Sequence, residues 1–310
     1  MQITMMNRHE PYYSAMLNNL TREVFGFSFA PWQQAGQWDA RYESYSVIED
    51  GRMLSNLCLF KAELLVSGKH MTALQLGAVA TRESWRGRGL SRTLMEHVIA
   101  LYPDTPMYLF ANQSVLGFYP KFGFERKAKW RLTLEAGDEP GAPVPAGYLS
   151  FGAAAPRSPD DTFAHGSSVP PPARRIPATD ARVMKALAVR GARSALLDTR
   201  SADPVAVFHL IMDYPDDVYY LPGLDVVTVA RLEGDTLSLI DIIARAPLPF
   251  AAVISALQFR GYRRLEFGFC PDWLGVKPRC EAVDDDNDAL FLKGVWTLND
   301  GFVFPAMGIT

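Results

Sequence analysis

Apolar and polar residues recur along the first part of the chain at the spacings of short strands and amphipathic helices. Leu90, Leu94 and Val98 follow one another at helical spacing before Pro103, which predicts a helix over residues 90–101. The same analysis predicts helices at 12–24 and 112–121 and strands at 45–49, 54–66, 72–81, 107–111 and 124–134. Strand and helix patterns therefore follow one another throughout this region.

Proline, glycine, alanine and serine crowd into residues 136–172, which predicts a linker between a first domain at 1–135 and a second at 173–310. A chain of 310 residues is long enough for two domains. The linker contains one strand-like segment, GYLSFGA at 147–153. Beyond it we expect helices at 178–189 and 249–259 and strands within 226–244, 263–269 and 289–295. Paired strands, a helix and a strand thus recur in the order of the first half.

Composition and charge narrow the classes of function. Apolar residues make up 48% and charged residues 21% of the chain, and the net charge is −3, so the chain is typical of a globular protein and lacks the basic surface of a nucleic-acid binder. No apolar run is long enough to span a membrane and the N-terminus has no signal-peptide pattern, so we expect a soluble cytoplasmic protein without a membrane partner.

Cysteine and histidine spacing gives no sign of a disulfide framework or a metal site. Cys58, Cys270 and Cys280 form no paired motif, and the five histidines are scattered without ligand spacing. The acidic run at 284–286 is typical of a solvated loop.

The informative run is LGAVATRESWRGRGLSRTLM at 76–95, where an apolar strand enters a helix through a turn that contains Gly87 and Gly89. Unpaired amides and the helix dipole at such a junction bind anions, and the two glycines keep the backbone open to the close approach of a diphosphate, which a side chain could block. The turn lacks the Lys-Ser/Thr pair of a nucleotide triphosphatase and the third glycine of a dinucleotide fold. Four arginines surround it and would attract phosphates: Arg82, Arg86, Arg88 and Arg92.

This strand, the RGRGL turn, the helix, Asn112 and the FYPKFGF element at 118–124 together resemble the GNAT (GCN5-related N-acetyltransferase) superfamily. The family pattern R/Q-x-x-G-x-G/A is matched from Arg86 onward, except that Ser91 replaces the last small residue. The resemblance implies an α/β (α+β) fold with a mixed central sheet flanked by helices. The chain as a whole also resembles the tandem bacterial members of this superfamily, in which a second, smaller GNAT-like domain is degenerate.

By this resemblance the chain is an N-acetyltransferase of the acyltransferase class that uses acetyl-CoA as cosubstrate and no metal. Turn amides would hold the CoA diphosphate and the preceding strand the pantetheine arm. The implied cofactor residues are Val79, Ala80, Thr81, Arg86, Gly87, Arg88, Gly89, Leu90, Ser91, Arg92 and Asn112. Tyr119 matches the family's general acid, and a phenol of pKa about 10 is protonated at neutral pH and can protonate a thiolate.

The base that deprotonates the amine is left open. Family members often place a glutamate on the strand before the turn, where this chain has Gln75, so Glu43, Asp39 or a water chain are the candidates. An aromatic stretch lies where the family places its acceptor wall. The residues expected to contact the acceptor are Phe27, Trp32, Trp38, Tyr42 and Glu43.

Two functions remain open at this level. The first is acetyl transfer to a primary amine of a small molecule or peptide. The second is a non-catalytic acyl-CoA-binding sensor or interaction protein. An uncharged acceptor pocket would favour this sensor, whereas acidic groups near the thioester would favour the enzyme. The second half enters its helix through prolines, so we expect no second CoA site there; it would complete a shared sheet or close the acceptor cleft. A monomer and a dimer are both compatible with the sequence.

Overall fold

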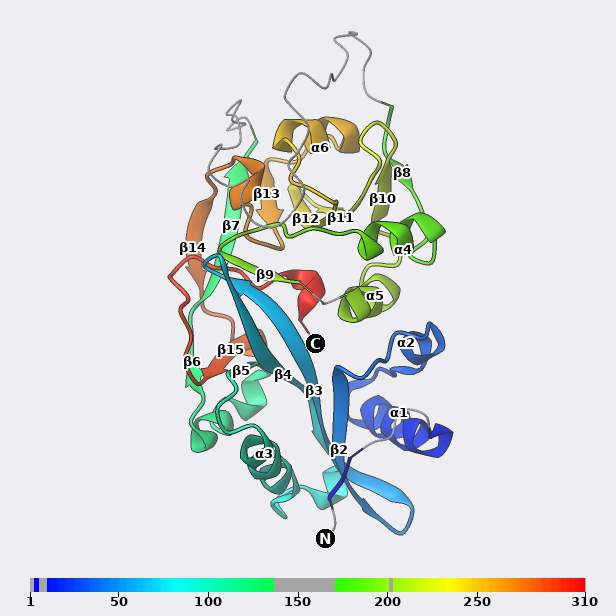
Figure 1. Ribbon diagram of the computed structural model, residues 1–310, viewed down its shortest axis with the longest axis vertical. Helices are drawn as coiled ribbons and strands as arrows, with labels where there is room; N and C mark the ends of the chain where they lie inside the picture. The colour runs from blue at the N-terminus through cyan, green and yellow to red at the C-terminus, as the bar shows by residue number, and fades with distance from the viewer. Residues whose placement is uncertain (1–2, 6–9, 137–170, 201–202, 310) are drawn as a thin grey trace.

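The computed structural model describes residues 3–5, 10–136, 171–200 and 203–309. These residues form two mixed sheets with helices against them, so the expected architecture is confirmed (Figure 1). Most of the predicted linker, with its strand-like segment at 147–153, lies outside the described residues, and the domain boundary there stays a prediction.

The first sheet has the strand order β1-β2-β3-β4-β5-β15-β6, with β9 paired to β3. Its strands are β1 (Ile3–Met5), β2 (Tyr42–Glu49), β3 (Arg52–Val66), β4 (Lys69–Thr81), β5 (Met107–Ala111), β6 (Glu125–Arg126), β9 (Leu197–Thr199) and β15 (Ala289–Lys293). Helices α1 (Pro11–Phe25) and α2 (Ala30–Gln34) share one apolar core with Tyr42, whereas α3 (Leu90–Leu101) shares another with Tyr45. Because side chains alternate along β2, α3 covers the face opposite α1 and α2.

The second sheet has the order β14-β7-β13-β12-β11-β10-β8. Its strands are β7 (Lys129–Glu135), β8 (Arg174–Arg175), β10 (Val218–Leu221), β11 (Val226–Glu233), β12 (Thr236–Ile243), β13 (Arg264–Phe267) and β14 (Arg279–Val283). The helices of this part are α4 (Ala181–Ala188), α5 (Asp203–Met212) and α6 (Phe250–Leu257). No helix in the described part of the chain is both long and apolar enough to cross a bilayer.

The two sheets repeat one topology. In the first, β1 to β4 are antiparallel, β4 and β5 are parallel, and β15 and β6 follow antiparallel. In the second, β8, β10, β11 and β12 are antiparallel, β12 and β13 are parallel, and β7 and β14 follow antiparallel. The repeated order of strand pairs and helix in the sequence therefore corresponds to a repeated sheet.

The equivalent strands β15 and β7 are exchanged between the two sheets. The pattern at 124–134 predicts one strand, but the structure contains two pieces, with β6 in the first sheet and β7 in the second. The place between β5 and β6 is taken by β15, from the far end of the chain. Alternating residues predict a strand without indicating its partner, because pairing is decided by side chains distant in sequence.

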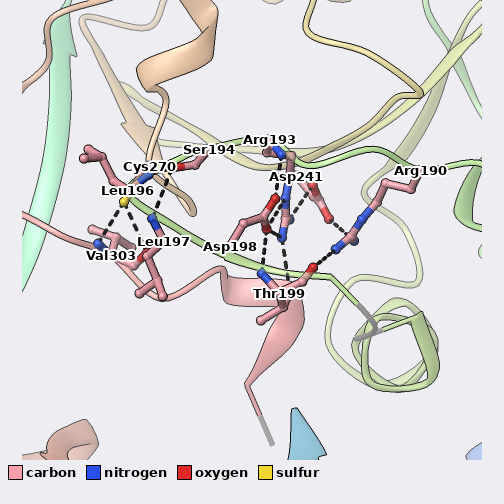
Figure 2. A network of polar contacts seen from close by, with 10 residues as sticks. All are labelled: Arg190, Arg193, Ser194, Leu196, Leu197, Asp198, Thr199, Asp241, Cys270 and Val303. Atoms are coloured by element: carbon pink, nitrogen blue, oxygen red, sulfur yellow. Dashed lines mark hydrogen bonds and ion pairs between the residues drawn. The ribbon is translucent and has the colours of Figure 1, made fainter. Parts of the chain in front are cut away.

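A buried polar network joins the sheets (Figure 2). The Arg193 guanidinium lies 2.5 Å from Asp198 on β9 and 2.7 Å from Asp241 on β12. Arg190 lies 3.4 Å from Asp241 and donates to the carbonyl of Thr199 at 2.9 Å. Since β9 extends the first sheet and β12 belongs to the second, these paired charges hold the sheets to each other.

Candidate active site

The turn between β4 and α3 has the geometry of an anion site. Gly87 and Gly89 have φ of 75° and 81°, in the left-handed region that favours glycine, and a Cβ added at either would meet no atom within 4 Å. The first amides of α3 have no acceptor within the helix, so they are available to a ligand. An open backbone with free donors at a helix start fits a diphosphate.

Ser91, the departure from the family pattern, ties the start of α3 to the sheet. Its hydroxyl lies 2.7 Å from that of Thr81, which lies 2.7 Å from that of Ser55. Ser55 donates its own hydrogen to the carbonyl of Ala80 at 2.8 Å, so Thr81 must donate to Ser55 and Ser91 to Thr81. The serine therefore positions the turn.

Three of the four arginines lie near the turn with their side chains exposed or half-buried. Arg88 stacks on Trp85, with its guanidinium carbon 4.3 Å from the ring centroid, and Arg92 lies 3.5 Å from Glu96. The expectation for Arg82 is wrong, since this side chain is buried in an ion pair with Glu23. Arg82 anchors the end of β4 to α1 and is not available to phosphates.

β4 and β5 diverge where β4 bulges. Their register covers only Leu74 with Met107 and Gln75 with Tyr108, so the rest of β4 has no partner on β5. The pairing of β4 with β3 shifts by one residue at Ala78, whose φ is 46°. The predicted pantetheine contacts Val79, Ala80 and Thr81 lie on this stretch, beside the opening between the two strands.

Asn56 holds the bulge in place. It is fully buried on β3 and donates its amide to the carbonyl of Ala78 at 3.2 Å. Its amide oxygen accepts from Ser44 at 2.5 Å and Ser46 at 2.9 Å. Sequence reasoning missed this group, although a Ser-x-Ser pair and an asparagine within two apolar strands are a signal for a buried polar network.

Tyr119 lies on the α3 side of the sheet, where the short turn η3 (Tyr119–Phe122) begins. The predicted helix at 112–121 is instead two short 3₁₀ turns, the first being η2 (Gln113–Val115), which Asn112 caps by accepting from the Ser114 amide at 2.9 Å. The Tyr119 ring packs against Phe291 of β15, with centroids 5.7 Å apart. Burial raises the pKa of Tyr119 to about 12, so the phenol stays protonated at neutral pH.

On the opposite face lies a cavity of about 430 Å³ between α1, α2, β4 and α5. It brings together the predicted acceptor residues Phe27, Trp32 and Tyr42 with the bulge residue Ala78. Its lining residues are Phe25, Phe27, Phe29, Trp32, Tyr42, Ala78, Val205, Phe208, Met212 and Asp213. Trp38 packs behind this wall, 4.6 Å from the Tyr42 ring, and does not line the cavity.

The structure does not bring the proposed bases to this cavity. Glu43 points to the α3 face, where it accepts from Lys61 at 2.5 Å and from Tyr45 and Tyr102. Burial raises the pKa of Glu43, but these hydrogen bonds together lower it below the usual range, which leaves a weak base. Asp39 pairs with Arg41 at 2.5 Å, and Gln75 is fully buried.

The acidic group in the cavity wall is Asp213, which the sequence analysis did not single out. It follows α5 and lies 2.6 Å from Nδ1 of His209. The available signal was a histidine and an aspartate four residues apart, a spacing that places both on one face of any helix that contains them. Within the described ranges, no group of three or more His, Cys, Asp or Glu side chains is placed to hold a metal ion.

The part of the chain that contains the glycine turn and Tyr119 is similar to a known protein family. Residues 12–126 match the model of the acetyltransferase (GNAT) domain family. No curated protein sequence matches the chain.

The similarity to solved structures covers both sheets of this chain. Eis1 from Mycobacterium abscessus is 15% identical, with 94% of this chain and 73% of that chain covered and a TM-score of 0.55. A probable N-acyltransferase from Enterococcus faecalis V583 is 13% identical, with coverage of 94% and 70% and a TM-score of 0.52. A GCN5-related N-acetyltransferase from Kribbella flavida is 14% identical, with coverage of 94% and 71% and a TM-score of 0.50. At these identities the likeness shows the fold alone.

Proposed function

We propose that this protein transfers an acetyl group from acetyl-CoA directly to a primary amine. One observation carries the proposal: Ala78 belongs both to the bulge where β4 and β5 diverge and to the wall of the aromatic cavity. A thioester held along β4 would therefore meet an amine held in the cavity, and such juxtaposition accounts for much of the catalysis of a two-substrate reaction.

The residues present fit acetyl-CoA. The open glycines and free amides of the turn suit the diphosphate, with Arg86 and Arg88 beside it. The unpaired side of β4 suits the amide groups of pantetheine, which need backbone partners. Acetyl-CoA supplies an activated acetyl group, and the protein's part is to orient it toward the cavity.

Tyr119 is the proposed general acid. Its phenol is buried and protonated, and a neutral phenol can donate to the sulfur of departing CoA. The aromatic core around it, including Phe291, fixes the ring and excludes water. This assignment follows from the resemblance of the FYPKFGF element and from the state of the phenol.

The sensor hypothesis predicts that acetyl-CoA binds without turnover. Asp213 in the cavity wall supports the enzyme, because a carboxylate gives a protonated amine a place to bind and lose its proton. We further infer a cytoplasmic location, where acetyl-CoA is available, and an acceptor that is a small molecule or a peptide.

The test is calorimetric titration with acetyl-CoA, followed by thiol release against a panel of amines for wild type and Tyr119→Phe. Binding with amine-dependent release that falls in the variant supports the proposal. Binding with no release by any amine would favour the sensor, and absence of binding would refute both functions.

A further inference from the structure

The cavity is built mainly of aromatic rings from both halves of the chain. Phe208 of α5 lies 6.0 Å from Phe27, 5.8 Å from Phe29 and 5.9 Å from Trp32, measured between ring centroids. Trp32 in turn donates its indole hydrogen to the carbonyl of Pro204 at 2.5 Å, which fixes the first aromatic wall to the start of α5. These edge-on and tilted rings favour a flat apolar group between them.

Among the described residues that line this cavity, Asp213 is the one that carries a charge. Its side chain is 50% exposed, so a ligand can approach it from solvent as well as from the cavity. Aromatic faces and one carboxylate together form a site for a cation attached to an apolar body, since each stabilises positive charge.

His209 holds this carboxylate in position. The His209 Nε2 atom faces the carbonyl of Ile309, and because a carbonyl only accepts, this nitrogen must carry a hydrogen. The other nitrogen, Nδ1, lies 2.6 Å from Oδ2 of Asp213. The imidazole is largely buried, with 12% of its side chain exposed, so the pair has a fixed geometry.

We propose that the acceptor is an arylalkylamine, a primary amine on a compact, flat apolar body, and that Asp213 receives its ammonium group. This rests on the proposed function and names the substrate class of the same site. A volume of about 430 Å³ suits one small aromatic ligand. Polyamines and aminoglycosides carry several cations for one carboxylate, and amino acids bring a carboxylate that Asp213 would repel.

In the proposed reaction Asp213 accepts one proton and Tyr119 donates one. The bound ammonium loses one proton to Asp213, which passes it to solvent, and the freed nitrogen lone pair then attacks the acetyl carbon. The C–N bond forms and the C–S bond breaks, and Tyr119 donates its proton to the sulfur. The second proton lost from nitrogen restores Tyr119 through solvent, so one proton is released overall.

The experiment compares phenethylamine, phenylalanine, spermidine and kanamycin as acceptors, with Asp213→Asn and the matched control Asp216→Asn. Asp216 is exposed on the same segment and does not line the cavity. We expect phenethylamine to have the highest kcat/KM, and Asp213→Asn to lower it about a hundredfold while Asp216→Asn changes it less than about twofold. Thermal melting checks that both variants are folded.

Direct binding separates this inference from the proposed function. Phenethylamine is titrated by calorimetry into wild type and Asp213→Asn in the presence of CoA, which cannot react. Binding to wild type that weakens at least about tenfold in Asp213→Asn supports the inference even if no turnover is found. Binding of acetyl-CoA with no preference for phenethylamine over phenylalanine, or equal effects of the two variants, would overturn it and leave acetyl transfer standing.

Discussion

Gly89 is the most direct test of where CoA binds, because two nearly isosteric substitutions separate backbone conformation from charge. Gly89 precedes α3 with φ of 81°, and the space around a Cβ there is open. Asparagine and aspartate both tolerate the left-handed region better than other side chains, so Gly89→Asn and Gly89→Asp should fold alike. We expect each to lose about 1 kcal/mol of unfolding free energy relative to wild type.

The difference between the two variants lies in one negative charge. A carboxylate about 5 Å from a phosphate, at an effective dielectric constant of about 20, is repelled by roughly 3 kcal/mol for each unit of charge. That corresponds to an acetyl-CoA affinity at least about a hundredfold weaker for Gly89→Asp than for Gly89→Asn. Salt should reduce the gap, since the Debye length falls to about 3 Å at 1 M.

The assay is calorimetric titration of both variants with acetyl-CoA at low and high salt. If the aspartate and asparagine variants bind acetyl-CoA equally well at low salt, the diphosphate does not lie at this turn. A gap that persists unchanged at high salt would also contradict the electrostatic argument.

Three further predictions follow from the site and the core. Tyr119→Phe should lower kcat about a hundredfold at unchanged acetyl-CoA affinity. Because burial raises the pKa of Tyr119 to about 12, kcat of the wild type should not fall from loss of this proton as the pH rises past 10. A fall in kcat near pH 10 would argue for another acid. Ser91→Ala should raise the KM for acetyl-CoA several-fold with kcat nearly constant, whereas an unchanged KM would show that the hydroxyl chain does not position the turn. Asp241→Asn should destabilise the fold by about 3–5 kcal/mol, because the substitution removes the negative charge that faces both buried guanidinium groups, Arg190 and Arg193. A loss below about 1 kcal/mol in urea unfolding would refute this.

The pattern of apolar and polar residues predicted those helices and strands that can be recognised from their own residues alone. The helix at 90–101 and the strand at 107–111 match α3 and β5, because an amphipathic period and a short apolar run need no knowledge of distant residues. Helix α5 was not predicted, since its sequence is apolar nearly all round and shows no contrast between faces. It contributes Val205, Phe208 and Met212 to the cavity wall, so this part of the acceptor site was missed with it.

The predicted strand at 45–49 begins three residues later than β2, so the alternation of side chains was not applied to Tyr42 and Glu43. Tyr42 and Glu43 are neighbours on a strand, so one of them had to leave the acceptor face, and the structure shows that it is Glu43. The spacing of His209 and Asp213 indicates a shared helix face, but their place beside the acceptor residues depends on how the second half packs on the first. The cofactor contacts and the role of Tyr119 stay predictions that the proposed measurements test.

The exchange of β7 and β15 ties the two halves of the chain together, although the glycine turn described above lies only in the first. Deletion of the second half would remove β15 from beside β5 and with it Phe291, which supports the ring of Tyr119. The exchanged strands thus make each sheet depend on a strand from the other half of the chain, so neither half is a separable unit.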